Sequence, residues 1–315
     1  MCGNERNQAH FEGNEYRYPR ALVFGSLNLD HVYAVDHIVT AGETISSAGL
    51  RQNSGGKGLN QAIALAKAGA DTSLAGRIGS DGEGLRDVCR QSGVSAEHIQ
   101  VSEVPTGNTM IQVDRNGQNC ILLFGGANRT QTKEQIDQTL ACFRSGDYLF
   151  LQNEINHLPY LIEQAHARGM HIVLNPSPFE KSLLQCDLQK LSWLIVNEVE
   201  GFQMTGQHAP QAILDRLQAE YPGVNLVLTM GKDGSMCVRD GQVYQQACCQ
   251  VTAVDTTAAG DTFTGYFFAQ IMAGGMVERA LAMASQAAAI TVSRPGAADS
   301  IPNAEEVVQM MKGER

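Results

Sequence analysis

The sequence has little positive charge and no long apolar run. Its 23 lysines and arginines are outnumbered by 33 aspartates and glutamates, which gives a formal net charge of -10. A nucleic acid or an anionic membrane surface would need a basic patch, so we expect neither as a partner. No stretch approaches the roughly 18 apolar residues of a membrane span. With 43% hydrophobic and 18% charged residues, the composition is that of a globular protein rather than a disordered one.

The sequence also lacks the cysteine and histidine spacings of common metal sites. Its eight cysteines include no CxxC pair and its eight histidines no HExxH motif, so a structural zinc site has no support. Scattered cysteines of this kind are typical of buried thiols in a reducing compartment. The N-terminus contains no apolar core of a signal peptide. We therefore expect a cytoplasmic protein.

Strand and helix patterns alternate along most of the chain. After Gly126 the alternation is regular, with short apolar runs separated by segments of helical period. Strands joined by helices predict a mostly parallel central sheet covered on both faces, which is a three-layer α/β/α sandwich. Length alone leaves open whether the chain forms one domain or two. Residues 1–19 are polar, and we expect them to form a disordered tail.

Two regions depart from this alternation. Residues 32–54 form short β-like runs without a sustained helical period. Residues 109–113 and 120–124 flank an Asn-Gly pair, which is a strong hairpin signal between β runs. We expect these two regions, about residues 32–54 and 105–126, to form a small second sheet that stands off the main one.

A loop of small residues, Ala258-Ala259-Gly260, leads into an Ala-rich helical pattern with Asp261 in its first turn. Small residues let a ligand approach the backbone, and the unpaired N–H groups of a helix start favour an anion. A carboxylate there could accept a proton from a substrate hydroxyl while neighbouring N–H groups hold a phosphate. Phosphoryl transfer to an alcohol requires this pairing. On this stretch alone, Asp261 could equally be only a helix cap.

Other polar residues could serve such a reaction, although each has an ordinary structural alternative. Asn28 and Asp30 follow a buried strand, where ligands bind in open α/β sheets, but they could be turn-forming residues. Residues 55–60 could be a flexible loop before a helix. They are not a Walker A motif, because Gly58 stands where that motif needs Ser or Thr.

Taken in order, five segments resemble the ribokinase family of carbohydrate kinases, of the phosphofructokinase-B type. They are residues 28–30, 55–62, 197–200, 229–234 and 255–265. Two motifs are specific, namely Gly-Gly-Lys-Gly-Leu-Asn-Gln-Ala in the second segment and Asp-Thr-Thr-Ala-Ala-Gly-Asp-Thr-Phe in the last. The resemblance implies one ribokinase-like kinase domain at residues 20–315, with the small sheet as its lid.

By this resemblance, Asp261 is the base that takes the proton from the sugar hydroxyl. The backbone of Ala258, Ala259 and Gly260 would form the anion hole for the transferred phosphate. Many members have Gly where this chain has Ala258. A methyl group does not block a helical backbone, so we expect the substitution to leave catalysis intact.

The resemblance also implies a sugar site and a nucleotide site. The residues implied to bind the sugar are Asn28, Asp30, Gly56, Lys57, Asn60, Ile111, Glu154 and Asp261. Of these, Ile111 could equally be a core residue and Glu154 a solvated loop charge. The residues implied to bind the nucleotide are Asn197, Thr229, Gly231, Lys232, Gly234, Gly260 and Ser285. A generic turn after a strand is the alternative for residues 229–234.

Two metal sites follow from the resemblance. Asn197 and Glu200 would hold Mg²⁺ through water, although they could also be an N-cap and its first-turn acid. A monovalent cation, K⁺, would be bound by the side chains of Asp255 and Ser300 together with backbone carbonyls. The residues implied to supply those carbonyls are Thr257, Thr291, Arg294 and Gly296.

The sequence thus predicts an ATP-dependent sugar kinase that transfers the γ-phosphoryl group to a primary hydroxyl, with ribose to ribose 5-phosphate as the favoured reaction. Its cofactors would be ATP, Mg²⁺ and K⁺. In this family two lids pair, so a homodimer is expected. One alternative is another acceptor, such as fructose, deoxyribose or adenosine, because the motifs specify phosphoryl transfer better than the sugar. The other is a non-catalytic sugar or nucleotide sensor on the same fold.

Overall fold

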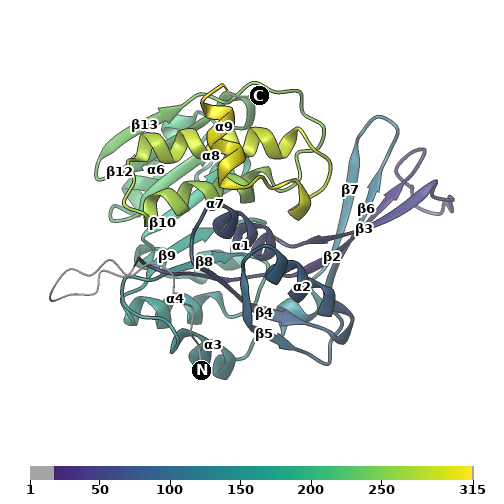
Figure 1. The fold of residues 1–315 in the computed structure, drawn as a ribbon, viewed down its shortest axis with the longest axis horizontal. Coiled ribbons are helices and arrows are strands. Elements are labelled where there is room, and N and C mark those ends of the chain that lie inside the picture. The colour runs from purple at the N-terminus through teal and green to yellow at the C-terminus, as the bar shows by residue number, and fades with distance from the viewer. Residues whose placement is uncertain (1–17, 314–315) are drawn as a thin grey trace.

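The computed structural model describes residues 18–313, which form a nine-stranded sheet between two helical layers and a separate four-stranded sheet (Figure 1). This arrangement confirms the predicted α/β sandwich. The expected disordered tail falls almost entirely on residues 1–17, which lie outside the described part of the chain. Among residues 18–313, no helix combines the length and the apolar character needed to cross a bilayer.

The central sheet has the strand order β13-β12-β11-β10-β9-β8-β1-β4-β5. Neighbouring strands pair in parallel from β5 to β11, whereas β12 and β13 add as antiparallel strands at one edge. The strands are β1 Ala21–Phe24, β4 Thr72–Ile78, β5 Ser95–Val101, β8 Tyr148–Gln152, β9 His171–Asn175, β10 Trp193–Asn197, β11 Asn225–Thr229, β12 Ser235–Arg239 and β13 Gln242–Gln246.

Helices cover both faces of this sheet. The helices are α1 Lys57–Lys67, α2 Glu83–Gln91, α3 Lys133–Leu140, α4 Leu158–Ala167, α5 Glu198–Thr205, α6 Pro210–Glu220, α7 Ala259–Met272, α8 Val277–Val292 and α9 Ala304–Met311. The helices α1, α2, α7, α8 and α9 pack on one face, while α3, α4 and α6 pack on the other. The all-apolar strand β1 shows why, because Ala21 and Val23 point into the first layer and Leu22 and Phe24 into the second.

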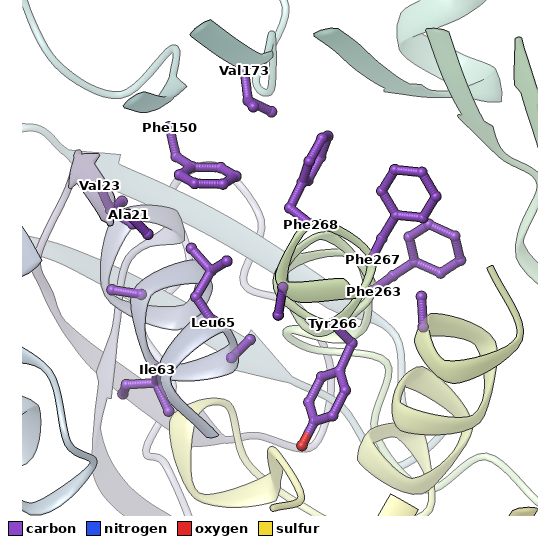
Figure 2. Packing of buried hydrophobic residues seen from close by; sticks show 14 of the residues in the cluster. Ala21, Val23, Ile63, Leu65, Phe150, Val173, Phe263, Tyr266, Phe267 and Phe268 are labelled. Atoms are coloured by element: carbon purple, nitrogen blue, oxygen red, sulfur yellow. The ribbon is translucent and has the colours of Figure 1, made fainter. Parts of the chain in front are cut away.

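Aromatic side chains fill the first layer between the sheet and α7. Phe150 of β8 meets Phe268 of α7 edge to face, with ring centroids 5.4 Å apart (Figure 2). Trp193 of β10 contacts Phe267 and Phe268 in the same geometry. Such edge-to-face pairs add to the free energy gained by burying the rings. They fix α7 on the sheet, and with it the helix start that carries Asp261.

The small sheet consists of β2 Asn28–Ala34, β3 Gly49–Gly55, β6 Gly107–Val113 and β7 Asn119–Phe124, in the order β3-β2-β6-β7. It projects from the body of the molecule (Figure 1). Its strands β2 and β6 pair in parallel, and the outer pairs are antiparallel. The hairpin of β6 and β7 agrees with the Asn-Gly signal.

Two features differ from the sequence interpretation. Asn28 and Asp30 were expected just beyond a central strand, but they lie inside β2 of the small sheet. The chain therefore passes from one sheet to the other within residues 25–27. The strand β5 was not predicted, because its residues are mostly polar and only Ile99 is buried. It adds to the edge of the sheet beside β4.

The helices α1 and α7 are in backbone contact at Gly265. A β-carbon on Gly265 would lie 2.3 Å from the Cβ of Ala64 and 2.7 Å from the backbone N of Leu65. Only glycine permits this approach. Because Lys57 and Asn60 lie on α1 and Asp261 on α7, this contact sets how closely the two groups of side chains meet.

We predict that Gly265→Ala lowers the free energy of unfolding by about 1–3 kcal/mol, because the added methyl overpacks the contact between the helices. Chemical denaturation measures the change. Gly84→Ala in α2 is the matched control, because a β-carbon on Gly84 would have no atom within 4 Å. That control should leave the stability unchanged or raise it slightly, since Ala favours a helix over Gly. Equal losses of stability in both variants would contradict the close contact of α1 and α7 as the cause.

Candidate active site

A cavity of about 1290 Å³ lies at the carboxyl ends of the central strands, between them and the small sheet. Open α/β sheets bind their ligands at this edge. Most of the predicted site residues line it. They are Asn28, Asp30, Gly56, Lys57, Asn60, Ile111, Glu154, Asn197, Glu200, Thr229, Asp255, Thr257, Ala258, Ala259, Gly260, Asp261 and Gly296.

Seven predicted residues do not line this cavity, namely Gly231, Lys232, Gly234, Ser285, Thr291, Arg294 and Ser300. Gly231 and Lys232 form an exposed short 3-10 helix, η5 Gly231–Asp233, just after β11. Ser285 is buried in α8. The structure therefore brings the predicted sugar residues together with the start of α7, while the outer part of the nucleotide site stays a prediction.

Asp261 lies in the first turn of α7 and is only 7% exposed. Its carboxylate accepts two side-chain hydrogen bonds, from Nδ2 of Asn60 at 3.2 Å and from Nε2 of Gln61 at 3.0 Å. Both donors lie on α1. The first N–H groups of α7 have no partner within the helix and so favour an anion at the same end. A carboxylate and an anion-binding helix start therefore share one position.

The residue before α7 corrects one expectation. Ala258 was expected to have a helical backbone, but its φ is 60°, in the left-handed region. A β-carbon costs roughly 1–2 kcal/mol there, whereas glycine adopts this conformation freely. A glycine at this position would therefore adopt the turn without strain. This chain keeps the same turn with an alanine and stores the strain beside the helix start.

Lys57 lies among three acidic side chains. Burial would lower the pKa of its ammonium group, but the charges of Asp261, Glu154 and Glu200 outweigh this effect and raise the pKa above its usual value. Glu154 in turn accepts hydrogen bonds from the hydroxyl of Ser26 and from the backbone N of Lys57. Lys57 is therefore a permanently charged group within the cavity.

Burial dominates the titration of two carboxylates. It raises the pKa of Glu154, although Lys57 and the Ser26 hydroxyl oppose the change. It also raises the pKa of Asp30, against a hydrogen bond of 2.5 Å from the hydroxyl of Thr109. Carboxylates that are partly removed from water gain from hydroxyl donors supplied by a ligand.

The orientation of Asn28 is set by a residue that sequence analysis missed. Nδ2 of Asn128 donates to Oδ1 of Asn28 at 2.7 Å. Asn128 also exchanges hydrogen bonds with the backbone N and O of Leu27. With its oxygen engaged, Asn28 keeps its amide N–H groups for the cavity. The Asn28 donor and the Asp30 acceptor, both on β2, suit the paired hydroxyls of a sugar.

Ser26, Thr109, Asn128 and Gln61 were all absent from the predicted site. Gln61 stands within the specific motif at residues 55–62, and Asn128 follows a Gly-Gly pair after the hairpin. The neighbouring residues could therefore have indicated Gln61 and Asn128 as candidate site residues. Ser26 and Thr109 carry no such signal, because an isolated hydroxyl residue in a strand pattern is ordinary.

Asn197 and Glu200 form a complete capping box at the start of α5. Oδ1 of Asn197 accepts from the backbone N of Glu200 at 2.9 Å, and Glu200 accepts from both the backbone N and the side chain of Asn197. The ordinary structural role is thus real. Both residues also line the cavity, and carboxylate oxygens have further lone pairs. Asn197 and Glu200 can therefore cap α5 and still offer lone pairs to a ligand in the cavity.

Asp255 organises the loop that precedes α7. Its Oδ1 accepts from the backbone N and the hydroxyl of Thr257, and its Oδ2 accepts from the backbone N of Gly296 at 3.0 Å. Partial burial would raise the pKa of Asp255, but these hydrogen bonds outweigh it and lower the pKa. The loop is thus joined to the segment after α8.

The remaining predicted cation ligands lie around this junction. Thr291 is fully buried and its hydroxyl donates to that of Thr262 in α7. Ser300 is buried at the end of η6 Ala298–Ser300, where its hydroxyl donates to the carbonyl of Ala297. The side chain of Arg294 forms an ion pair with Glu306 of α9.

The charges around the cavity are unbalanced. Among the described residues that line it, six are acidic and two, Arg51 and Lys57, are basic. A polyphosphate would meet repulsion from this set unless cations accompanied it. Oxygen donors of this kind suit hard cations such as Mg²⁺ or K⁺. No group of three or more His, Cys, Asp or Glu side chains that could hold a metal occurs within residues 18–313, so any cation would also need water, carbonyl or phosphate oxygens.

The cavity combines polar side chains that suit hydroxyl groups, a helix start that favours an anion, and a carboxylate, and this combination suits a phosphotransferase with an alcohol acceptor. Residues 19–304 match the pfkB family of carbohydrate kinases. The chain belongs to that family.

Known relatives agree with this assignment. The chain is 33% identical to the ribokinase of Haemophilus influenzae over 302 residues, which cover 92% of this chain and 97% of the relative. It is 28% identical over 295 residues to the deoxyribokinase of Salmonella typhi, covering 90% and 96% of the two chains. The ribokinase of Arabidopsis thaliana, solved with ribose and ATP, superposes with a TM-score of 0.82 at 27% identity, covering 94% of this chain and 99% of that one.

We predict that Asp30→Asn raises the melting temperature at pH 7. The pKa of Asp30 is raised in the folded state, so its ionised carboxylate destabilises the fold. This destabilisation develops as the pH rises from the pKa of the unfolded state, about 3.9, through the pKa of the folded state. The gain from the amide should therefore vanish below about pH 4. Thermal melts across this range measure it.

Asp81→Asn is the control with the opposite sign. Burial acts to raise the pKa of Asp81, but hydrogen bonds from Thr106 outweigh it and lower the pKa. Its ionised form therefore stabilises the fold, and that contribution is lost as the pH falls through the folded pKa. The amide at position 81 should lower the melting temperature at pH 7. A pH-independent gain for Asp30→Asn would contradict the assigned cause.

Proposed function

We propose that this protein is an ATP-dependent kinase that transfers the γ-phosphoryl group to the primary hydroxyl of ribose, giving ribose 5-phosphate. One observation carries the proposal. Asn28, Asp30, Lys57 and Glu154 converge on the same cavity as Asp261 at the start of α7. The likeness to the Haemophilus and Arabidopsis ribokinases supports ribose as the acceptor and ATP as the donor.

In this proposal, Asp261 is the general base. It accepts the proton of the sugar hydroxyl as the oxygen attacks the γ-phosphorus, and the bond from this phosphorus to the bridging β-phosphate oxygen breaks to release ADP. The backbone of Ala258, Ala259 and Gly260 stabilises the charge on the transferred phosphoryl group. Asn28, Asp30 and Glu154 hold the other hydroxyls of the sugar. Their contribution is to orient one hydroxyl toward the donor, so that the reaction proceeds within a bound complex.

The charge of the donor requires cations, as the acidic lining of the cavity indicates. Mg²⁺ would be held through water by Asn197 and Glu200, and when bound it would neutralise charge on the phosphates. The nucleotide would lie beyond these residues, against Thr229 and the loop with Gly231, Lys232 and Gly234, with Ser285 near its base. The capping box orients the Glu200 carboxylate at this position.

K⁺ would bind on the other side of the anion hole. The side chains of Asp255 and Ser300 and the carbonyls of Thr257, Thr291, Arg294 and Gly296 are its proposed ligands. Asp255 already joins the loop before α7 to Gly296. A cation at this junction would therefore act on the conformation of residues 255–260 without touching the sugar.

The small sheet would be a lid, and two lids would pair in a homodimer. Strand alternation places Val32, Ile111 and Ile121 toward the cavity. The opposite side carries four exposed apolar side chains, Leu50, Met110, Leu122 and Phe124. Exposed apolar groups of this size favour association with another chain. We also place the protein in the cytoplasm, which the free thiols of the seven described cysteines support.

The second candidate is a kinase for 2-deoxyribose, which the likeness to the Salmonella deoxyribokinase favours. The two acceptors differ by one hydroxyl. A carboxylate such as Asp30 that receives a hydrogen bond from that hydroxyl would be left unpaired by the deoxy sugar. Fructose or adenosine would be alternative acceptors in place of ribose, and a non-catalytic sensor would bind ligands without turnover.

We predict that ribose gives the highest kcat/KM in a coupled ADP-release assay with ribose, 2-deoxyribose, fructose and adenosine. The preference over 2-deoxyribose should be at least about tenfold, because a buried acceptor would lose its donor. A higher value for 2-deoxyribose would replace ribose with the second candidate. Binding of ATP without turnover of any acceptor would contradict the kinase and favour the sensor.

We also predict that the rate is higher in potassium chloride than in tetramethylammonium chloride at equal ionic strength, because the large organic cation cannot be bound by the loop oxygens. Asp255→Asn should reduce this difference, since it removes the charged ligand. Thermal melts check that the variant is folded. Equal rates of the unsubstituted protein in the two salts would exclude the potassium site.

A further inference from the structure

A chain of buried amides leads from the central sheet to Asp261. Nε2 of Gln152, at the end of β8, donates to Oε1 of Gln61 at 2.7 Å. Nε2 of Gln61, on α1, donates to Oδ1 of Asp261 at 3.0 Å. Gln152 is fully buried and Gln61 is 1% exposed. These two hydrogen bonds thus connect β8, α1 and α7 through buried side chains, of which Asp261 alone lines the cavity.

The direction of these hydrogen bonds is set by the carboxylate. An ionised carboxylate only accepts, so Gln61 must present its NH₂ group to Asp261. Its oxygen then faces Gln152, which must present an NH₂ group in turn. Neither amide can rotate by half a turn without placing two acceptors against each other. While Asp261 is ionised, the amides of Gln61 and Gln152 therefore have only one orientation each.

This arrangement carries a structural cost. Among the described residues, Oε1 of Gln152 is one of a few buried side-chain oxygens without a hydrogen-bond partner. It occupies the space that a side chain on Gly25 would fill, since a β-carbon there would lie 2.2 Å from this oxygen. Unpaired buried acceptors cost stability. An apolar side chain at this position would avoid that cost but would leave Oε1 of Gln61 without its donor, so the amide at position 152 is needed to pair with Gln61.

We propose that Gln61 and Gln152 are positioning residues for the base. Gln61 holds one oxygen of Asp261, Asn60 holds the other at 3.2 Å, and Gln152 fixes the rotamer of Gln61. The carboxylate is thereby fixed in its plane, with lone pairs left for the substrate hydroxyl. The inference rests on the proposed role of Asp261 and adds two residues that act through it.

The test is a kinetic comparison of Gln61→Leu and Gln152→Leu with the unsubstituted protein, using ATP and ribose. If ribose is not turned over, the acceptor with the highest kcat/KM in the sugar panel takes its place. We expect kcat to fall about ten- to a hundredfold for Gln61→Leu, as for the loss of a hydrogen bond to a charged group. Gln152→Leu should give a smaller fall. The KM for the sugar should change by less than about threefold in both, because neither amide touches the sugar.

Gln135→Leu is the matched control. Gln135 is another buried glutamine, 2% exposed, and its Nε2 donates to the backbone O of Gly76 away from the cavity. Its replacement should leave kcat unchanged, even if the melting temperature falls. A comparable loss of kcat in this control would overturn the inference, because any buried amide would then have the same effect.

A double-variant cycle tests whether Gln61 acts through Asp261 or has only a general structural role. Asp261→Asn should lower kcat by orders of magnitude, and adding Gln61→Leu to it should cause little further loss, since Gln61 acts through the carboxylate. If the two substitutions lower kcat independently, so that their effects multiply in the double variant, Gln61 does not act through Asp261 and the inference is wrong. A near-normal kcat for Asp261→Asn would instead overturn the assignment of the base. If both glutamine variants fail to fold in thermal melts, the amides are structural and the inference is wrong.

Discussion

The site depends on one buried cluster of charge. Lys57 is the centre of this cluster, and Asp261, Glu154 and Glu200 keep it charged in spite of its burial. Each of these carboxylates comes from a different part of the fold: the start of α7, the segment after β8, and the start of α5. The ammonium group of Lys57 therefore lies in the combined electrostatic field of carboxylates from three elements. This field favours the arrangement in which the starts of α1, α5 and α7 and the segment after β8 meet at the cavity.

The packing below the cavity supports this cluster. Gly265 lets α7 touch α1 at the backbone, and the aromatic layer holds α7 against the sheet. Above it, the left-handed turn at Ala258 places the first N–H groups of the helix at the cavity. Stable packing and local strain thus occur within two turns of the same helix. The strained turn persists because the packed part of α7 holds the helix in place.

Most of the order of strands and helices was predictable because the inner strands β1, β8, β9, β10 and β11 are largely apolar runs. The polar edge strand β5 gave no such signal and was missed. Most of the site residues that the motifs indicated do line the cavity. Sequence analysis failed where the residue type has a common alternative role. Thr109 and Asn128 act through contacts with Asp30 and Asn28 that are distant in sequence, and Ala258 was misjudged because its backbone conformation depends on the turn rather than on the helix that follows.

The hydrogen bond between Gln61 and Asp261 joins residues 200 positions apart. During synthesis, α1 leaves the ribosome long before α7 has been made. The lysine cluster is then incomplete, because Asp261 is the last of its acids to appear in the chain. Contacts of such sequence separation form late and slow the folding of a domain. Unfinished chains and fragments that end before α7 therefore lack Asp261 and the first turn of α7, so they cannot assemble the cavity described here.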